Sequence, residues 1–350
     1  MSSSPLPPRT RTRILFCGNH HPKEATDLLL AERYDEATRD ALDVCWCVPA
    51  DVREEAKTAD VLVPLACKLP REVLEGARDA KVCIQYGVGV EGVDRAACDE
   101  LGIWVSNVPS QGSANAVGVA ELAVYLTIAA LRRHGEMEQA IRSRRVNTPI
   151  GDTLAGKRVL LVGFGGIGVE VAKRLRLWDC SVSALRAREW VEGRDGEAVD
   201  EAARHLHAKG TWEADRLAFA AKADVVIVSA MANAATAGMI DRAFLEACPD
   251  GVVLVNVARG LVLDRDAVAW ALGAGKIGGL AIDVFWEEPL DPTDPIVAHP
   301  RTYATPHCGG TTRQSYEGLS TGIVEAALAV RAGRRPPVVL NEPKSPRVGA

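Results

Sequence analysis

The chain lacks the features that mark several large classes of protein. No apolar run approaches the roughly 18 to 20 residues that a membrane span needs, and the start has no apolar signal-peptide region. The net charge is −5, so no basic excess favours a nucleic-acid partner. We therefore expect a cytoplasmic protein with no membrane and no nucleic-acid partner. Residues 1–13, rich in Ser, Pro and Arg and free of acid, leave open an organelle presequence remnant.

Disulfide frameworks and metal-site spacings are also missing. The nine cysteines are an odd number without framework spacing, so we expect reduced thiols in an intracellular compartment. Cys45-x-Cys47 and the pair His20-His21 form the only cluster that suggests a metal. Neither has the four-ligand spacing of a zinc site, so we expect no metal.

The chain does contain a long alternation of apolar runs and helix-like stretches. At 350 residues it is long enough for two domains. Continuous apolar strands indicate parallel sheets covered on both faces. We predict an α/β fold of two doubly wound, Rossmann-like domains with a cleft between them and ligands at the carboxyl ends of the strands. The expected strands cover residues 13–18, 61–64, 82–86, 157–162, 181–185, 223–228, 251–256, 279–284 and 302–306. The expected helices cover residues 23–31, 71–78, 116–133 and 314–331, and the tail from Gly333 is expected to be poorly ordered.

A Gly-x-Gly-x-x-Gly motif joins a buried strand to a helix. Gly163 permits a tight turn, Gly165 permits close backbone approach to a pyrophosphate, and Gly168 permits close packing of the helix on the strand. The phosphates would lie at the positive N-terminal end of the helix. An ordinary glycine turn is the alternative, but the flanking strand and helix favour a dinucleotide site. Its predicted residues are Gly163, Phe164, Gly165, Gly166, Ile167 and Gly168.

The acid that usually follows the second strand and holds the adenosine ribose is missing. Arg186 and Arg188 stand there instead. A guanidinium cannot accept a hydrogen bond from a 2′-hydroxyl, but it can bind a 2′-phosphate. We therefore expect NADP(H) in preference to NAD(H). The alternative is that both arginines are solvated loop charges and another residue contacts the ribose.

Four polar residues lie at or just after the carboxyl ends of the late strands: Arg259, Asp283, Glu288 and His307. An Arg can bind a carboxylate and polarise the adjacent ketone, and a His can move a proton to or from the oxygen. A carboxylate on the other ring nitrogen fixes the His tautomer and stabilises the cation. With a nicotinamide, this set suits the interconversion of a 2-oxo acid and a 2-hydroxy acid. Each residue alone also has an ordinary structural explanation.

Three segments around these residues resemble the signatures of the D-isomer-specific 2-hydroxyacid dehydrogenase family. They are Asn-Val-Ala-Arg-Gly at 256–260, Asp-Val-Phe-Trp-Glu-Glu-Pro-Leu at 283–290, and Thr-Pro-His at 305–307. The Arg-to-Glu spacing (288 − 259 = 29) and the Glu-to-His spacing (307 − 288 = 19) are those expected of the family. The likeness extends over nearly the whole chain.

The resemblance implies roles for individual residues. It makes Arg259 the group that binds the substrate carboxylate and keto group, His307 the acid/base, and Glu288 the partner of His307. It also places Ala258 and Asp283 beside the cofactor.

The resemblance further implies that the loop 86–94 binds the substrate carboxylate through the amides of Val88 and Gly89. The outer wall of the pocket is expected from residues 64–69 and Trp286. By this resemblance, glyoxylate and hydroxypyruvate are the expected substrates, and a small acid fits a site with little basic charge besides Arg259. Lys68 is an alternative contact for a phosphorylated acid.

The resemblance also makes the domains discontinuous. Residues 1–109 and 309–350 would form the substrate-binding domain, and residues 110–308 the dinucleotide-binding domain. Relatives usually form homodimers through the cofactor domain, which would place the contact near the helix 116–133. A second hypothesis is a dinucleotide-sensing, corepressor-like binding protein on the same fold with little turnover.

Overall fold

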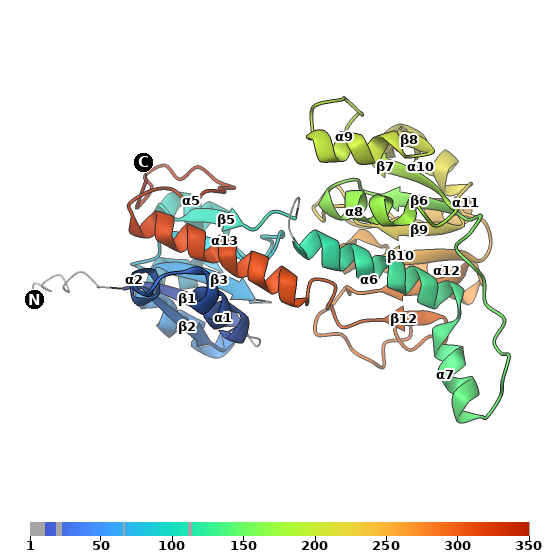
Figure 1. Ribbon diagram of the computed structural model, residues 1–350, viewed down its shortest axis with the longest axis horizontal. Coiled ribbons are helices and arrows are strands. Elements are labelled where there is room, and N and C mark those ends of the chain that lie inside the picture. The colour runs from blue at the N-terminus through green and yellow to red at the C-terminus, as the bar shows by residue number, and fades with distance from the viewer. Residues whose placement is uncertain (1–10, 19–22, 66, 111–113, 350) are drawn as a thin grey trace, which may run out of the picture. The chain divides into compact units, whose positions relative to one another are not determined.

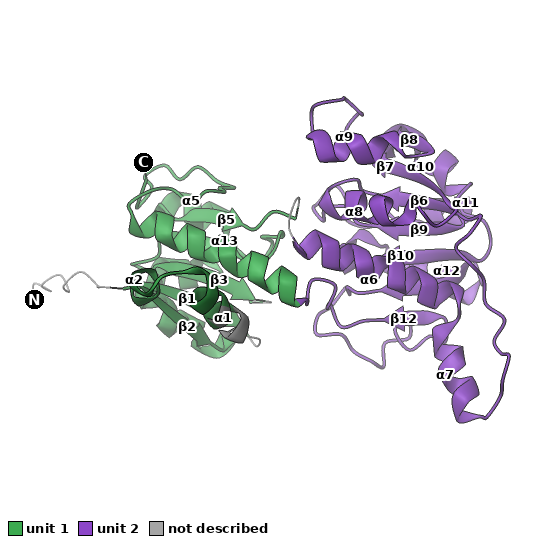
Figure 2. Cartoon of the chain, in the orientation of Figure 1, with its two compact units in different colours: residues 1–110, 313–350 green, residues 111–312 purple. Residues whose placement is uncertain are grey.

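The computed structural model describes residues 11–18, 23–65, 67–110 and 114–349. The chain forms two compact units, residues 1–110 with 313–350 and residues 111–312 (Figure 2). Unit 1 is therefore built from both ends of the chain, and unit 2 from its middle. The first segment of unit 1 ends at residue 110, where residue 109 was expected. Unit 2 ends at residue 312, where residue 308 was expected.

Unit 1 contains a parallel sheet in the order β2-β1-β3-β4-β5. The apolar-run pattern predicts the three central strands but not the two at the edges. The reason is composition, because edge strand β2 is largely half-exposed and β5 ends in the polar residues Ser106 and Asn107. The strands are β1 (Thr12–Gly18), β2 (Leu42–Cys47), β3 (Val61–Leu65), β4 (Val82–Gln85) and β5 (Trp104–Asn107).

Helices cover both faces of this sheet (Figure 1). Successive side chains of β1 alternate between the two cores, with Leu15 and Cys17 in one and Ile14 and Phe16 in the other. This double burial explains why the central strands are continuous apolar runs. The helical segments are α1 (Lys23–Arg33), α2 (Glu36–Asp40), η1 (Pro49–Asp51), α3 (Val52–Glu55), η2 (Ala56–Thr58), α4 (Arg71–Gly76), α5 (Arg95–Leu101) and α13 (Arg313–Arg331).

Unit 2 contains a second parallel sheet, in the order β12-β11-β10-β9-β6-β7-β8. Chain order reverses between β6 and β9, which pair in the middle of the sheet. The carboxyl end of β6 is therefore the switch point at which such sheets bind ligands. The strands are β6 (Arg158–Val162), β7 (Ser181–Arg186), β8 (Ala208–Thr211), β9 (Val225–Val228), β10 (Val252–Asn256), β11 (Ile277–Ile282) and β12 (Thr302–Ala304).

Two apolar cores lie on opposite faces of the unit 2 sheet. Val159 and Leu161 of β6 belong to the core under α6, α8 and α9, and Leu160 and Val162 to the core under α10, α11 and α12 (Figure 1). The helical segments are α6 (Ala114–Leu131), α7 (His134–Arg142), α8 (Gly166–Leu175), α9 (Glu197–Arg204), α10 (Trp212–Ala220), α11 (Arg242–Ala247), η3 (Gly260–Val262) and α12 (Arg265–Gly273). The predicted fold, two Rossmann-like α/β units, is confirmed.

The expectation that no segment is long and apolar enough for a membrane span is wrong for α6. By length and composition this helix would qualify. Most of it is buried, however, and residues such as Ala120, Ala123 and Leu126 belong to the core of unit 2. Its apolar character is that of a core helix.

The expectation of a poorly ordered tail after Gly333 is also wrong. Leu340 donates its amide to Val105 of edge strand β5, and the buried Asn341 side chain accepts from the amide of Val105. The Arg347 guanidinium donates to the carbonyls of Ala77 and Ala80, both at 2.7 Å. Composition does not predict this order, because the tail is held by backbone groups of distant segments.

Candidate active site

The glycine loop between β6 and α8 has the geometry that its sequence predicts. Gly163 has a φ of +100°, and a Cβ there would lie 2.6 Å from the amide nitrogen of Ala230. A Cβ on Gly168 would collide with the carbonyl oxygen of Gly163, which explains the close packing of α8. At Gly165, in contrast, a Cβ would meet no atom within 4 Å.

These contacts fit a bound dinucleotide. The first and third glycines are required by the protein itself, whereas Gly165 faces open space next to the N-terminus of α8. Gly165 is the N-cap and has no side chain to cap the helix, so the positive end of α8 is left for an anion such as a pyrophosphate. Of the other predicted loop residues, Phe164 is buried in the core, and Gly166 and Ile167 are half-buried at the start of the helix.

Arg186, the last residue of β7, is held by its own loop. Its Nη1 donates to Oδ2 of Asp195 at 2.6 Å, and its Nη2 donates to the carbonyl of Glu189 at 2.6 Å. Its side chain is only 11% exposed, whereas that of Arg188 is 72% exposed. Arg188 places Nη2 3.1 Å from the other oxygen of Asp195. Asp195 is not predicted from the sequence, because its only local signal is its place between Gly193 and Gly196.

Trp190 connects this cluster to the glycine loop. The Arg186 guanidinium lies 4.2 Å from the centroid of the Trp190 ring, and that ring lies 5.2 Å from the ring of Phe164. The indole nitrogen donates to the carbonyl of Gly210. The end of β7 and the glycine loop are therefore parts of one packed surface.

Arg259 is the N-cap of η3, directly after β10, and it is half-buried. The fully buried side chain of Asn256 fixes the turn, because its Oδ1 accepts from the amide of Ala258 and its Nδ2 donates to the carbonyl of Arg259. The Arg259 side chain donates to the carbonyl of Ala258 at 2.7 Å. Asn256 is a positioning residue to which the sequence argument assigned no role.

Glu288 and His307 form a hydrogen-bonded ion pair. Nδ1 of His307 lies 2.7 Å from Oε2 of Glu288, and the other carboxylate oxygen accepts from the amide of Phe285. Burial acts to raise the pKa of the Glu288 carboxyl. The hydrogen bond and charge of His307, the Phe285 amide and the charge of Arg259 outweigh it, so this pKa lies below its ordinary value. Glu288 is therefore ionised at neutral pH.

A buried carboxylate supports the loop that carries His307. Asp283 is 2% exposed and accepts hydrogen bonds from the Thr305 hydroxyl and from the amides of Cys308 and Gly309. His307 has a φ of +52°, a conformation that non-glycine residues adopt only where their surroundings enforce it. The observed contacts of Asp283 provide that enforcement. Its expected place beside the cofactor stays a prediction.

The Cys308 thiol next to His307 stays neutral. Burial raises the pKa of this thiol, and the negative charge of Asp283 raises it further. A protonated thiol is a poor nucleophile.

The remaining predicted residues are placed as follows. Val88 and Gly89 lie in the loop after β4 of unit 1, where the Asn107 side chain donates to the carbonyl of Val88 at 2.7 Å. Lys68 is exposed. The Trp286 indole donates to the carbonyl of Leu263. Of the expected wall 64–69, Ala66 lies outside the described residues, as do His20 and His21.

Among the described residues, no three His, Cys, Asp or Glu side chains gather to hold a metal ion.

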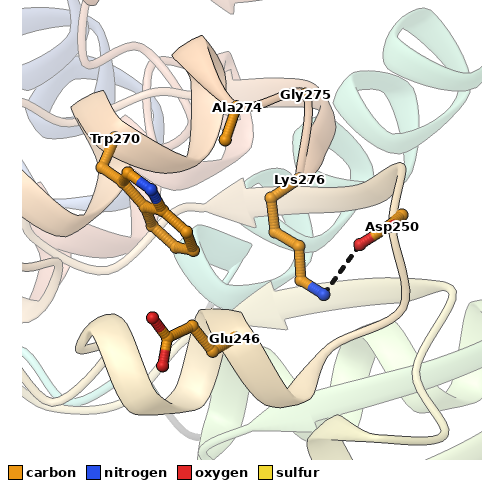
Figure 3. Close-up of a pocket in the computed structure, with 6 residues that line it drawn as sticks. All are labelled: Glu246, Asp250, Trp270, Ala274, Gly275 and Lys276. Carbon is orange, nitrogen blue, oxygen red and sulfur yellow. Dashed lines mark hydrogen bonds and ion pairs between the residues drawn. The ribbon is translucent and has the colours of Figure 1, made fainter.

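A cavity of about 340 Å³ lies elsewhere in unit 2 (Figure 3). Asp250 and Lys276, which precede β10 and β11, mark it as a feature of the amino edge of the sheet. Their side chains pair with each other at 2.9 Å, which neutralises the lysine. This cavity is therefore separate from the polar residues at the carboxyl edge. Its lining residues are Glu246, Asp250, Trp270, Ala274, Gly275 and Lys276.

Comparison with known families agrees with this geometry. The family described as "D-isomer specific 2-hydroxyacid dehydrogenase, NAD binding domain" matches residues 124–309, which is more than half of the chain. This chain belongs to the D-isomer specific 2-hydroxyacid dehydrogenase family. The matched region contains the glycine loop, Arg259, Glu288 and His307.

Individual relatives in this family carry different names. The chain is 30% identical to a D-3-phosphoglycerate dehydrogenase of Archaeoglobus fulgidus, over 82% of this chain and 52% of the relative. It is also 30% identical to a glyoxylate reductase of Thermofilum pendens, over 81% of each chain. The TT0316 protein of Thermus thermophilus superposes with a TM-score of 0.77 at 28% identity, over 94% of this chain and all of the other. The chain spans about half the length of the D-3-phosphoglycerate dehydrogenases of Archaeoglobus fulgidus and Arabidopsis thaliana that it matches.

Proposed function

We propose that this chain is a nicotinamide-dependent oxidoreductase that interconverts a small 2-oxo acid and a D-2-hydroxy acid, mainly in the direction of reduction. The observation that carries the proposal is the Glu288–His307 pair at 2.7 Å, at the same carboxyl edge of the sheet as Arg259 and the glycine loop. The bound nicotinamide supplies the hydride. The protein supplies the binding of the acid and the movement of one proton.

Arg259 binds the substrate in this proposal. A guanidinium matches a carboxylate bidentately and polarises the adjacent ketone, which makes the carbonyl carbon a better hydride acceptor. The hydrogen bonds of Asn256 to both sides of the turn fix the Arg259 backbone before the substrate arrives. The amides of Val88 and Gly89 are proposed as further donors to the substrate carboxylate.

His307 delivers the proton. Reduction places a negative charge on the former keto oxygen, and the imidazolium neutralises it by donating the proton of Nε2. Nδ1 is held by the Glu288 carboxylate, which orients the ring and stabilises its cation. The reverse reaction uses the neutral imidazole as base.

A small unphosphorylated acid, glyoxylate or hydroxypyruvate, is the proposed substrate. A substrate phosphate needs several cationic or amide donors. The charged groups bonded to His307 and to the amide of Cys308 next to it are carboxylates, those of Glu288 and Asp283, which would repel a phosphate. Lys68 of unit 1 is exposed, and we assign it as a contact for a group on the distal carbon of the substrate.

NADPH is the proposed cofactor, with NADH as the weaker one. Arg186, at the end of β7, and Lys209, within β8, lie over the ring of Trp190, and Arg188, two residues after Arg186, is largely exposed. Guanidinium groups at this end of a Rossmann sheet suit a 2′-phosphate. The carboxylate of Asp195, which pairs with both arginines, opposes this preference.

A homodimer through unit 2 is proposed as the assembly. The segment around α7 extends away from the sheet (Figure 1) and exposes apolar side chains, with Ile141, Val146 and Ile150 at 76%, 84% and 87% exposure. Tyr125 of α6 is half exposed next to this segment in the chain. Exposed apolar side chains clustered in a protruding arm favour a protein partner.

The test is NADPH oxidation with glyoxylate, hydroxypyruvate and 3-phosphohydroxypyruvate as separate substrates. We expect turnover with the first two and a much lower kcat/KM with the third. No turnover with any of them, despite NADPH binding, would favour the dinucleotide-sensing alternative. A preference for the phosphorylated acid would overturn the substrate assignment alone.

A further inference from the structure

The Asp195 carboxylate bridges the two arginines that follow β7. Oδ2 contacts Nη1 of Arg186 at 2.6 Å, and Oδ1 lies 3.1 Å from Nη2 of Arg188. The carboxylate therefore places one oxygen on each guanidinium, as two oxygens of a phosphate would. Asp195 is 19% exposed, so the contact lies at the surface and is open to exchange with a ligand anion.

The rest of Arg186 is already used. Its Nε donates to the carbonyl of Arg188, its Nη2 donates to the carbonyl of Glu189, and its plane lies over Trp190. Of the three guanidinium nitrogens of Arg186, only Nη1 contacts an anionic group, and that group is the Asp195 carboxylate. A 2′-phosphate can bind Arg186 through Nη1 only where the carboxylate has left it.

We propose that Asp195 is a specificity-determining residue whose carboxylate competes with the cofactor 2′-phosphate for Arg186 and Arg188. This inference rests on the proposed dinucleotide function of the site. With Asp195 in place, the two arginines and one aspartate have a net charge of +1, and a phosphate dianion is repelled by the carboxylate. With the charge of Asp195 removed, the same two guanidinium groups bind the phosphate without competition.

The local backbone suits such an exchange. Gly196, directly after Asp195, has a φ of +95°, and Gly193 before it has a φ of +80°. Glycines can leave these conformations at low cost, so the Asp195 segment can turn away from Arg186. The part of the loop before Asp195 stays anchored, by the Trp190 indole on the carbonyl of Gly210 and by the Gly193 amide on the Asp200 carboxylate.

The experiment is calorimetric titration of the full-length protein with 2′,5′-ADP and with 5′-AMP, in the absence of substrate. The variant Asp195→Asn keeps the shape of the side chain and removes its charge. The matched control is Glu192→Gln, which makes the same charge change in the same loop on a residue that pairs with Arg204. We expect Asp195→Asn to tighten 2′,5′-ADP about tenfold, through relief of one close charge repulsion, with 5′-AMP little changed. Glu192→Gln should change neither ligand.

The double variant Arg186→Ala/Asp195→Asn identifies the cation. It should lose most of the gain in 2′,5′-ADP affinity. An unchanged or weaker affinity for 2′,5′-ADP in Asp195→Asn would overturn the inference, because Asp195 would then order the arginines rather than compete. A separate result would refute the proposed NADPH preference. It is that the unmodified protein binds 5′-AMP as tightly as 2′,5′-ADP.

Discussion

His307 and Glu288 are 19 residues apart in the chain, yet Nδ1 of the first lies 2.7 Å from Oε2 of the second. The strands β11 and β12 are parallel neighbours and therefore end at the same edge of the sheet. The loops that follow them, which carry Glu288 and His307, meet at that edge. The pKa of Glu288 is lowered on balance, so its carboxylate keeps its charge until the pH falls through that lowered value. A negative charge therefore lies next to Nδ1 of His307 at neutral pH.

Replacing Glu288 by Gln removes this negative charge and keeps a hydrogen-bonding side chain. Reduction requires the imidazolium, so its rate falls as the pH rises and the proton is lost. Without the carboxylate the cation is less stable, and the alkaline limb of kcat/KM should move to lower pH. The measurement is the pH profile from about 5 to 10, a range that brackets histidine titration. Glu287→Gln, on the neighbouring exposed acid, is the control and should leave the limb in place. An unmoved limb in Glu288→Gln would mean that the pair does not set the protonation of the acid.

Replacing Arg259 by Ala should separate catalysis from cofactor binding. We expect kcat/KM for reduction to fall by more than a factor of about ten, because transition-state contacts to the keto acid are lost. The Kd of NADPH, measured by fluorescence titration, should be nearly unchanged. Arg301→Ala, an exposed arginine that precedes β12 at the opposite edge of the same sheet, is the matched control. Retention of most activity in Arg259→Ala would contradict the assigned role.

Two glycine variants should behave in opposite ways. Gly165→Ala adds a Cβ into open space, so the Tm should not change, but dinucleotide binding should weaken at least about tenfold if a pyrophosphate lies there. Gly168→Ala forces a contact with the carbonyl of Gly163 and should cost about 1–3 kcal/mol of stability. Thermal unfolding and calorimetric titration measure the two effects. Unchanged cofactor affinity in Gly165→Ala would place the pyrophosphate elsewhere.

Replacing Asp283 by Asn should destabilise the loop that carries His307. The buried carboxylate accepts three hydrogen bonds. The side-chain amide of the Asn variant would replace one accepting oxygen with an NH2 group, which would face one of these donors. An unsatisfied buried group costs about 1–3 kcal/mol, which urea unfolding should report. The kcat should fall with little change in the KM of the keto acid, because the substrate contacts of Arg259 remain. Full stability and kcat in the variant would show that His307 is held by other contacts.

The protruding arm around α7 should determine the assembly. We expect the unmodified protein to sediment as a dimer and the triple variant Ile141→Asp/Val146→Asp/Ile150→Asp as a monomer, because charges replace exposed apolar side chains. Leu177→Asp, equally apolar and 83% exposed but outside the arm, should remain dimeric. Sedimentation velocity distinguishes these states. A monomeric unmodified protein would refute the proposed dimer.

The fold class, the glycine loop and the order of Arg259, Glu288 and His307 along the strand ends are predictable from the amino-acid sequence alone. These features are local, because strand burial, the glycine motif and a residue's position after a strand are encoded within a few neighbouring residues. The central strands of both sheets were predictable for that reason. The edge strands β2, β5 and β8 were not, since β2 is largely half-exposed, β5 ends in two polar residues and β8 is a short Ala-Lys-Gly-Thr segment without an apolar run.

The partners that these residues contact, in contrast, depend on the tertiary structure. Asp195 lies nine residues after Arg186, and no pattern in the loop indicates that it folds back onto the guanidinium. In the same way, Asp283 accepts from amides 25 and 26 residues further along the chain, and Arg347 donates to carbonyls more than 260 residues earlier. Such contacts depend on where loops return in space, which is set by the packing of whole units rather than by local sequence.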